Sequence, residues 1–145
     1  MDKDTVVGVV GAGAMGTGIA QVAAAAGHHV VLADAMAGAT QKAQANLAKV
    51  MDREVEKGRL SRNAADELMS RIDYQWEPLG DDVSAFRRCG LVIEAVVEDL
   101  DTKRTLFRRL ESVVARDAVL ATNTSSLSVA SRRKSSHTWE CASGS

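Results

Sequence analysis

Short apolar runs alternate along the chain with longer stretches whose apolar residues recur at helical spacing. Four such runs lie at residues 5–10, 29–33, 91–97 and 118–121. They are apolar at consecutive positions rather than at every second one, which is typical of strands buried on both faces of a parallel sheet. The pattern therefore predicts four buried strands. A weaker pattern predicts a further strand at residues 74–76, before a turn at Pro78 and Gly80.

Helical patterns fill the segments between these strands. One covers residues 19–26 and ends at Gly27, and a long one covers residues 37–57 and ends at Gly58. Ser61 is a suitable N-cap for a third helix, and Asp99 begins a fourth. The last three of these helices are each expected to pack inward through one apolar stripe. The stripe of the long helix is Ala43, Leu47, Val50, Met51 and Val55, and that of the third helix is Ala65, Leu68, Met69 and Ile72. The stripe of the fourth helix is Leu100, Leu106, Phe107, Leu110, Val113 and Val114.

Strands that alternate with helices predict βαβ units. The expected fold is therefore α/β, a Rossmann-type doubly wound parallel sheet with helices on both faces. We expect one domain over residues 1–130. Residues 131–145 are mostly serine and charged residues without apolar periodicity, which predicts a disordered tail.

The composition excludes several classes of function. The 145 residues are 46% hydrophobic and 26% charged with a formal net charge of −1, which argues against nucleic acid or an anionic membrane as partner. No apolar run approaches the roughly 18 residues that would cross a bilayer, and residues 1–5 lack the pattern of a signal peptide. Cys89 and Cys141 are too few for a disulfide framework or a metal site, so we expect no metal and a cytoplasmic setting.

A glycine-rich turn joins the first predicted strand to the first helix. The segment Gly11-Ala-Gly-Ala-Met-Gly16 fits the pattern G-x-G-x-x-G and has a strand before it and a helix after it. In this context the pattern is typical of dinucleotide binding, with the pyrophosphate lying on backbone amides at the positive end of the helix. The cofactor-binding residues predicted here are Gly11, Ala12, Gly13, Ala14, Met15 and Gly16.

Asp34 follows the second predicted strand, 18 residues after Gly16. A carboxylate at this position accepts hydrogen bonds from the hydroxyls of the adenosine ribose and repels a 2′-phosphate. The next residues, Ala35 and Met36, supply no arginine to receive such a phosphate. The sequence therefore favours NAD over NADP. The alternative is a tight turn beside a solvated strand-end aspartate.

Four stretches together resemble the NAD-binding domain of the L-3-hydroxyacyl-CoA dehydrogenases, which include the 3-hydroxybutyryl-CoA dehydrogenases. They are Gly11-Ala-Gly-Ala-Met-Gly-Thr-Gly-Ile-Ala-Gln-Val-Ala23, Val30-Val-Leu-Ala-Asp34, Leu91-Val-Ile-Glu-Ala-Val-Val-Glu-Asp-Leu100 and Ala121-Thr-Asn-Thr-Ser-Ser-Leu127. The resemblance runs from about residue 5 to residue 130. It implies NAD-dependent oxidation of an L-3-hydroxyacyl-CoA to the 3-oxoacyl-CoA, or the reverse, as in fatty-acid metabolism and β-oxidation.

The resemblance also implies roles for individual residues. Glu98, Lys103 and Asn123 match cofactor contacts, and Ser125 matches a serine near the cofactor that hydrogen-bonds the reacting oxygen of the substrate. Without the resemblance, Lys103 is expected to be a solvated helix lysine, and residues 123–126 a loop that satisfies its own backbone. Glu94 either lines the cofactor cleft or is a satisfied strand-end carboxylate. Family contacts to coenzyme A come from the long second helix, where Arg53 or Lys57 is available.

The chain departs from the family pattern after Ser125. The family supplies its general base, a histidine, from a His-Phe-Phe-Asn-Pro segment about twenty residues further on, followed by a helical domain that forms the dimer. Here His137 is followed by Thr-Trp-Glu-Cys, so we assign it no catalytic role. His28 and His29 are expected to be structural. The sequence therefore suggests a family member cut short after its Asn-Thr-Ser-Ser loop, with a frameshifted or otherwise altered C-terminus.

Two alternatives to an active dehydrogenase remain open. The chain is either a remnant that binds a dinucleotide without turnover, or a related dehydrogenase that acts on a small hydroxy acid. The Asn-Thr-Ser-Ser loop at residues 123–126 and the Glu-Ala-Val-Val-Glu run at residues 94–98 argue against a 3-hydroxyisobutyrate-type enzyme.

Overall fold

One twisted sheet forms the centre of the molecule. The computed structural model describes residues 2–95, 99–122 and 132–133. Within these, the strands lie in the order β3-β2-β1-β4-β5-β6, with the first five parallel and β6 antiparallel to β5. The predicted doubly wound parallel sheet is confirmed. The strands are β1 (Val6–Val10), β2 (Val30–Ala33), β3 (Ile72–Tyr74), β4 (Cys89–Glu94), β5 (Val119–Thr122) and β6 (Arg132–Arg133).

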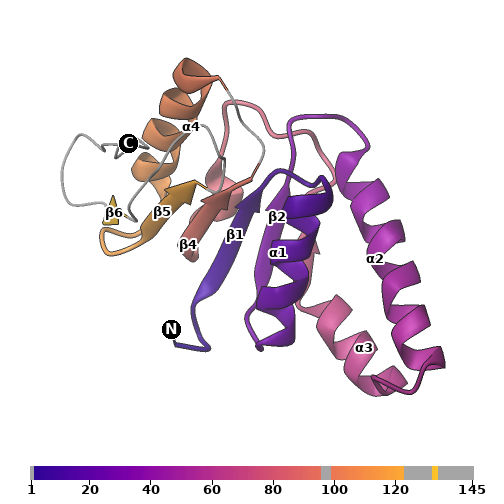
Figure 1. Ribbon diagram of the computed structural model, residues 1–145. Helices are drawn as coiled ribbons and strands as arrows, with labels where there is room; N and C mark the ends of the chain where they lie inside the picture. Colours follow the sequence, from indigo (N-terminus) through magenta and orange to yellow (C-terminus); the bar gives the residue numbers. More distant parts are fainter. Residues whose placement is uncertain (1, 96–98, 123–131, 134–145) are drawn as a thin grey trace, which may run out of the picture.

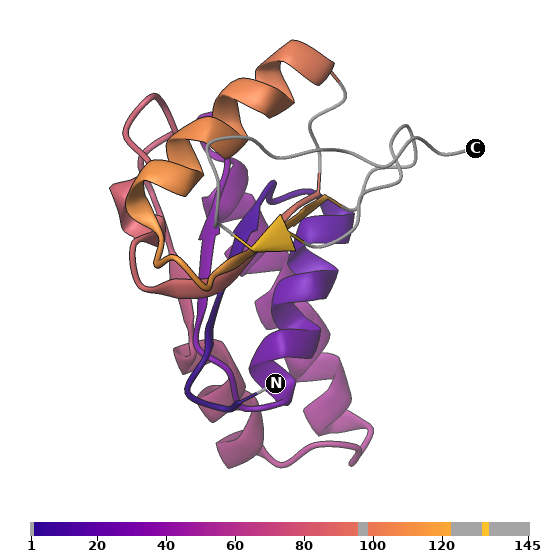
Figure 2. The same cartoon turned by 90° about the vertical axis from the view of Figure 1, so that its left-hand side faces the viewer.

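Helices cover both faces of this sheet, as Figures 1 and 2 show. The helices α1 (Ala14–Ala25), α2 (Ala39–Glu56) and α3 (Arg62–Ser70) pack on one face. The helix α4 (Leu100–Val113) and the short 3₁₀ helix η1 (Ser84–Phe86) pack on the other. Among the described residues, no helix is both long enough and apolar enough to cross a membrane.

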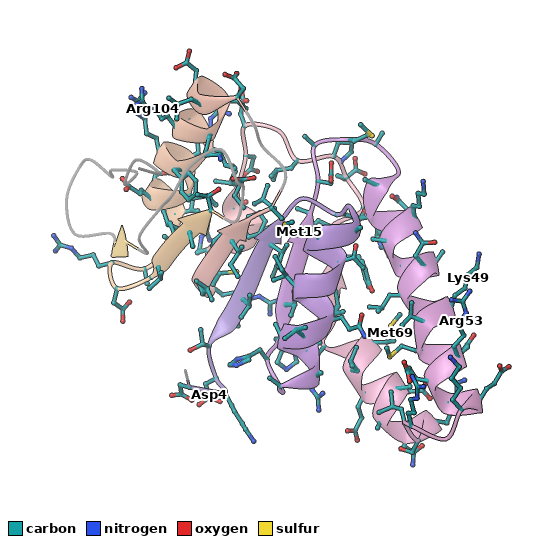
Figure 3. All side chains as sticks on the ribbon, viewed as in Figure 1. Asp4, Met15, Lys49, Arg53, Met69 and Arg104 are labelled. Carbon is teal, nitrogen blue, oxygen red and sulfur yellow. The ribbon has the colours of Figure 1, made fainter. Side chains whose placement is uncertain are left out.

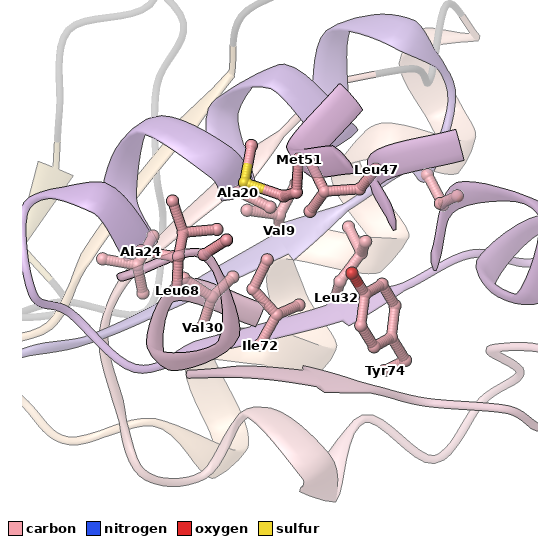
Figure 4. Packing of buried hydrophobic residues seen from close by; sticks show 14 residues of the cluster. Val9, Ala20, Ala24, Val30, Leu32, Leu47, Met51, Leu68, Ile72 and Tyr74 are labelled. Carbon is pink, nitrogen blue, oxygen red and sulfur yellow. The ribbon is translucent and has the colours of Figure 1, made fainter. Parts of the chain in front are cut away.

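Two apolar clusters, one on each face, explain why the strands are apolar at consecutive positions. In β1, Val7 and Val9 pack among the residues of α1, α2 and α3, whereas Val10 packs with Phe107 of α4. The four residues of β2 alternate in the same way, and all are buried. Figure 4 shows the first cluster, in which Val9 lies with residues of β2, β3 and the three helices.

The helices begin and end near the predicted positions, with three differences. The helix α1 begins at Ala14 rather than at residue 19, because close packing of Gly16 against the backbone of Gly11 offsets the low helix propensity of glycine. Ile72 belongs to β3 rather than to the third helix, and β3 ends at Tyr74, where the prediction began. Leu100 is 37% exposed rather than packed inward, since it begins α4 at the edge of the sheet.

Two strands also differ from the prediction. The strand β4 begins two residues early, at Cys89, and residues 96–97 of the predicted strand lie outside the described part. Within the segment predicted to be disordered, Arg132 and Arg133 form β6, which pairs with Leu120 and Val119. That pairing uses the free edge of β5, a backbone feature that composition does not report.

The carboxyl ends of four strands meet in one row across the sheet. Ala33 of β2 is in register with Val10 of β1, Val10 with Glu94 of β4, and Glu94 with Thr122 of β5. The strand order reverses between β1 and β4, because the chain proceeds outward from β1 to β3 on one side and from β4 to β5 on the other. This reversal is where open α/β sheets bind their ligands.

Candidate functional site

The glycine turn leaves β1 and enters α1 through a geometry that requires two of its glycines. Gly11 has a φ angle of +113°, which residues with a Cβ atom rarely adopt. A methyl group on Gly16 would overlap the carbonyl oxygen of Gly11, so helix and turn touch backbone to backbone. Gly11 therefore allows the sharp turn after β1, and Gly16 allows the helix to pack closely against that turn.

The N-terminal end of α1 is open to a ligand. Gly13 is the N-cap and has no side chain with which to cap the helix. The space around it is open, since a Cβ atom built there meets no atom within 4 Å. Residues 13–15 are exposed, with Met15 at 52%, and Figure 3 places Met15 at the end of α1 beside the turn. This positive helix end fits an anionic pyrophosphate.

Asp34 is bound to the glycine turn itself. Its Oδ2 accepts a hydrogen bond from the backbone amide of Ala12 at 2.7 Å, and its Oδ1 accepts one from the amide of Met36 at 2.8 Å. The backbone carbonyl of Asp34 accepts a hydrogen bond from the amide of Leu79 at 2.8 Å. Each carboxylate oxygen has a second acceptor position, so Asp34 can hold the turn and still accept hydrogen bonds from ribose hydroxyls.

Two hollows lie near Asp34, which lines the first, whereas its neighbour Ala35 lines the second. A groove of about 790 Å³ runs between α1 and α2 and is lined by Gly13, Asp34, Lys42 and Asn46 among others. A second hollow of about 410 Å³ lies at the carboxyl edge below α4, with apolar walls formed in part by Val10, Ala35, Leu79 and Leu106. Ligand-sized space therefore adjoins both the turn and the carboxylate.

A buried polar cluster occupies the other side of the reversal. Lys103 of α4 lies 3.2 Å from Glu94 Oε1 through its Nζ atom, and both side chains are fully buried. Its ammonium also donates to Thr122 Oγ1 at 3.2 Å, and the Thr122 hydroxyl donates to Glu94. The expectation that Lys103 is a solvated helix lysine is therefore wrong. Its position on the inner face of α4 next to Phe107 and Leu110 places it against the sheet.

Other predicted residues lie at varied distances from the turn. Glu98, Asn123 and Ser125 fall outside the described residues, so their roles stay predictions. Arg53 and Lys57 are exposed near the C-terminal end of α2, and Figure 3 shows Arg53 on the side of α2 that faces away from the sheet. His28 is buried, and its Nδ1 lies 2.9 Å from the carbonyl oxygen of Thr5, a structural contact far from the turn.

No metal centre accompanies these groups in the described part of the chain, since no three His, Cys, Asp or Glu side chains are arranged to hold an ion there. The contact between Asp34 and the turn was missed at the sequence level, because the pattern gives the spacing of the two segments but not their hydrogen bonds. The buried Glu94–Lys103 pair was missed for the same reason, although a lysine in line with Phe107 and Leu110 on α4 was a usable signal.

An open helix end, a glycine turn and a carboxylate at the end of the second strand together define a dinucleotide-binding domain of Rossmann type. Comparison with known proteins gives the family. The family model for the NAD-binding domain of 3-hydroxyacyl-CoA dehydrogenase matches residues 6–139. The chain belongs to this family, and its cofactor is NAD. The match extends nine residues beyond the resemblance found in the sequence.

Individual relatives agree with this assignment. The chain is 39% identical over 127 residues to the mitochondrial hydroxyacyl-coenzyme A dehydrogenase of Sus scrofa, covering 86% of this chain and 40% of that protein. It is 38% identical over 123 residues to a 3-hydroxybutyryl-CoA dehydrogenase of Clostridioides difficile, covering 83% and 41%. The chain thus spans about two fifths of the length of these curated relatives.

Solved structures show the same fold. The crystal structure of 3-hydroxybutyryl-CoA dehydrogenase from Escherichia coli superposes with a TM-score of 0.79 at 36% identity, covering 89% of this chain and 26% of that one. The (S)-3-hydroxybutyryl-CoA dehydrogenase from Ralstonia eutropha gives a TM-score of 0.77 at 33% identity, covering 87% and 43%.

Proposed function

We propose that this chain supplies the NAD-binding part of an oxidoreductase that interconverts an L-3-hydroxyacyl-CoA and the corresponding 3-oxoacyl-CoA. The observation that carries the proposal is the bond between Asp34 and the glycine turn beside the open end of α1. The names of the relatives supply the substrate class. NAD, when bound, takes the hydride from the alcohol or returns it to the ketone, and the protein positions the groups that react.

Three parts of the site would contact three parts of the cofactor. The amides at the start of α1 would hold the pyrophosphate, and Gly13 leaves room for it. Asp34 would accept hydrogen bonds from the adenosine ribose. The adenine ring would enter the hollow at the carboxyl edge, where Val10, Ala35 and Leu79 offer apolar contact.

The substrate side of the proposal rests on residues outside the described part. Ser125 would hydrogen-bond the reacting oxygen, and Glu98 and Asn123 would contact the cofactor near the nicotinamide, as the family resemblance implies. A serine hydroxyl at this place stabilises negative charge that develops on a ketone oxygen during reduction. The family resemblance implies a histidine as the general base, which has to lie within hydrogen-bond reach of the substrate hydroxyl.

The groove between α1 and α2 suits the coenzyme A part of the substrate. Lys42 lines this groove and offers a cation to a phosphate, whereas Arg53 and Lys57, which lie further along α2, are not among the residues that line it. Lys42 is therefore a better candidate than either residue picked from the sequence. Replacing Lys42 with Gln would weaken binding of a CoA ligand more than binding of NAD.

Three broader parts complete the proposal. The protein would act in fatty-acid metabolism, including β-oxidation, in the cytoplasm. It would work as a dimer, as the resemblance to a family whose helical domain forms the dimer implies. It would use neither nucleic acid nor membrane as a partner, consistent with its net charge of −1.

Calorimetric titration tests the cofactor assignment directly. We expect NAD⁺ and NADH to bind the 145-residue chain and NADP⁺ to bind at least about tenfold more weakly, since the Asp34 carboxylate repels a 2′-phosphate. Equal binding of NADP⁺ would contradict the role given to Asp34.

NADH consumption with acetoacetyl-CoA at neutral pH tests the activity. We expect turnover by these 145 residues to be at least about 10³-fold below that of a family enzyme with a His-Phe-Phe-Asn-Pro segment, since these residues contain none and a missing general base alone removes about 10²–10⁴. Binding of NAD without any turnover would favour the alternative, a dinucleotide-binding domain that is not catalytic by itself.

A further inference from the structure

The cluster of Glu94, Lys103 and Thr122 joins three elements that are distant in sequence. Glu94 ends β4, Thr122 ends β5, and Lys103 comes from the first turn of α4. The ammonium of Lys103 contacts both other side chains, and the hydroxyl of Thr122 bridges to Glu94. The carboxylate of Glu94 and the ammonium of Lys103 are thus held together where both side chains are closed to solvent.

This cluster lies close to the turn but on the opposite side of it from Asp34. Glu94 is in register with Val10, the residue before Gly11, and the amide of Ala95 donates to the carbonyl of Val10 at 2.9 Å. A dinucleotide that crosses the reversal of strand order has its adenosine at the end of β2, beside Asp34. Its nicotinamide half therefore lies toward the ends of β4 and β5, where the cluster is.

The charge at this place matters because the nicotinamide ring is a cation in NAD⁺ and neutral in NADH. A buried ammonium without its counter-charge would favour NADH, and a buried carboxylate without its counter-charge would favour NAD⁺. The two effects cancel when the charges form a pair, and charges shielded from water act over longer distances than exposed ones.

We propose that Glu94 is a positioning residue that fixes Lys103 and balances its charge, so that neither redox form of NAD is favoured by the end of β4. This inference rests on the proposed function, because it requires NAD to bind across the turn. It assigns Glu94 a role in the relative affinity for the two redox forms, beyond that of a satisfied strand-end carboxylate.

A double-mutant cycle on the pair tests the inference. Dissociation constants for NAD⁺ and NADH are measured for wild type, Glu94→Gln, Lys103→Met and the double variant. We expect the ratio of the NAD⁺ constant to the NADH constant to rise about three- to tenfold in Glu94→Gln and to fall by a similar factor in Lys103→Met. In the double variant it should return to within about twofold of wild type.

The ratio separates this role from a structural one. Loss of packing weakens the binding of both dinucleotides by the same factor, so it changes each dissociation constant but not the ratio of the two. Asp52→Asn is the matched control, because Asp52 forms an exposed ion pair with Arg62 at 2.9 Å on α2 and α3. If a single variant is too unstable for titration, the shift of its melting temperature with each dinucleotide supplies the same comparison.

The outcomes distinguish the inference from the proposed function. Opposite shifts in the two single variants support it. An unchanged ratio in both, with wild type binding both dinucleotides, overturns the inference alone. Failure of wild type to bind either dinucleotide overturns the proposed function as well.

Discussion

Two glycines in α1, only two residues apart, are expected to respond in opposite ways to the same methyl group. Gly16 packs against the turn, and a methyl group there would overlap the carbonyl oxygen of Gly11 and lie 3.4 Å from Val9 Cγ1. Gly18 has no atom within 4 Å of the same position. Gly16→Ala and Gly18→Ala therefore form a matched pair that differs only in what the methyl group meets.

The structure gives the sign and the size of each effect. The Gly11 carbonyl belongs to a backbone held by a φ of +113°, so it cannot rotate away as a side chain would. Forcing helix and turn apart costs about 1–3 kcal/mol, the usual range for overpacking. In Gly18→Ala the methyl group meets open space, and the lower entropy of the unfolded chain stabilises the variant by about 0.4–1 kcal/mol.

Denaturant unfolding and NAD titration measure the two consequences. We expect the free energies of unfolding of the two variants to differ by about 1.5–4 kcal/mol, with wild type between them. We also expect Gly16→Ala to bind NAD at least about tenfold more weakly, because the amides of the turn move, and Gly18→Ala to stay within about threefold of wild type. Equal stability of both variants would refute the backbone contact between helix and turn, and unchanged NAD binding by Gly16→Ala would refute its place in the site.

Three further predictions concern single side chains. Asp34→Asn keeps one acceptor oxygen for two backbone amides, so it should lower the free energy of unfolding by about 1.5–3 kcal/mol and weaken NAD binding at least about tenfold. The control Asp52→Asn, in an exposed ion pair, should lower the free energy of unfolding by less than about 1 kcal/mol. Equal effects of the two variants in chemical denaturation would contradict the contact between Asp34 and Ala12. Tyr74→Phe should raise the melting temperature or leave it unchanged, because the Tyr74 hydroxyl is buried without a hydrogen-bond partner among the described residues. A fall in the melting temperature that corresponds to more than about 1 kcal/mol would show that this hydroxyl forms a hydrogen bond. Burial raises the pKa of the Cys89 thiol from 9.0 to about 12, partly opposed by Arg88, so the unfolded chain loses this proton first. The contribution of this thiol to the free energy of unfolding should be constant below pH 9 and fall by up to about 1.4 kcal/mol per pH unit between pH 9 and 12. The free energy of unfolding of Cys89→Ala should therefore fall less steeply than that of wild type over that range, and equal slopes would contradict the buried thiol.

Much of the fold followed from local patterns. The apolar runs predicted β1, β2, β4 and β5 because a strand buried on both faces needs apolar residues at consecutive positions. The caps Ser61 and Asp99 were correctly placed, since their side chains accept backbone hydrogen bonds at the starts of α3 and α4. These features depend on neighbours within a few residues, which a sequence displays directly.

Other features depended on contacts that no local pattern contains. The start of α1 was placed too late, because packing of Gly16 against Gly11 offsets the low helix propensity of glycine. Ile72 was assigned to a helix because its spacing from Leu68 fits one, yet it pairs with Val30 in the sheet. Pairing with a strand more than forty residues away outweighs the helical spacing.

The candidate site divides in the same way. The sequence by itself determined the glycine turn and Asp34, because their spacing is set by one strand, one helix and the next strand in order. Only the tertiary structure decided that Asp34 holds the amide of Ala12 and that Lys103 is buried against Glu94 and Thr122. The physical reason is that the sheet brings the ends of β2, β1, β4 and β5 into one row, so residues up to 112 positions apart, Val10 and Thr122, share an edge where charge is paired rather than solvated.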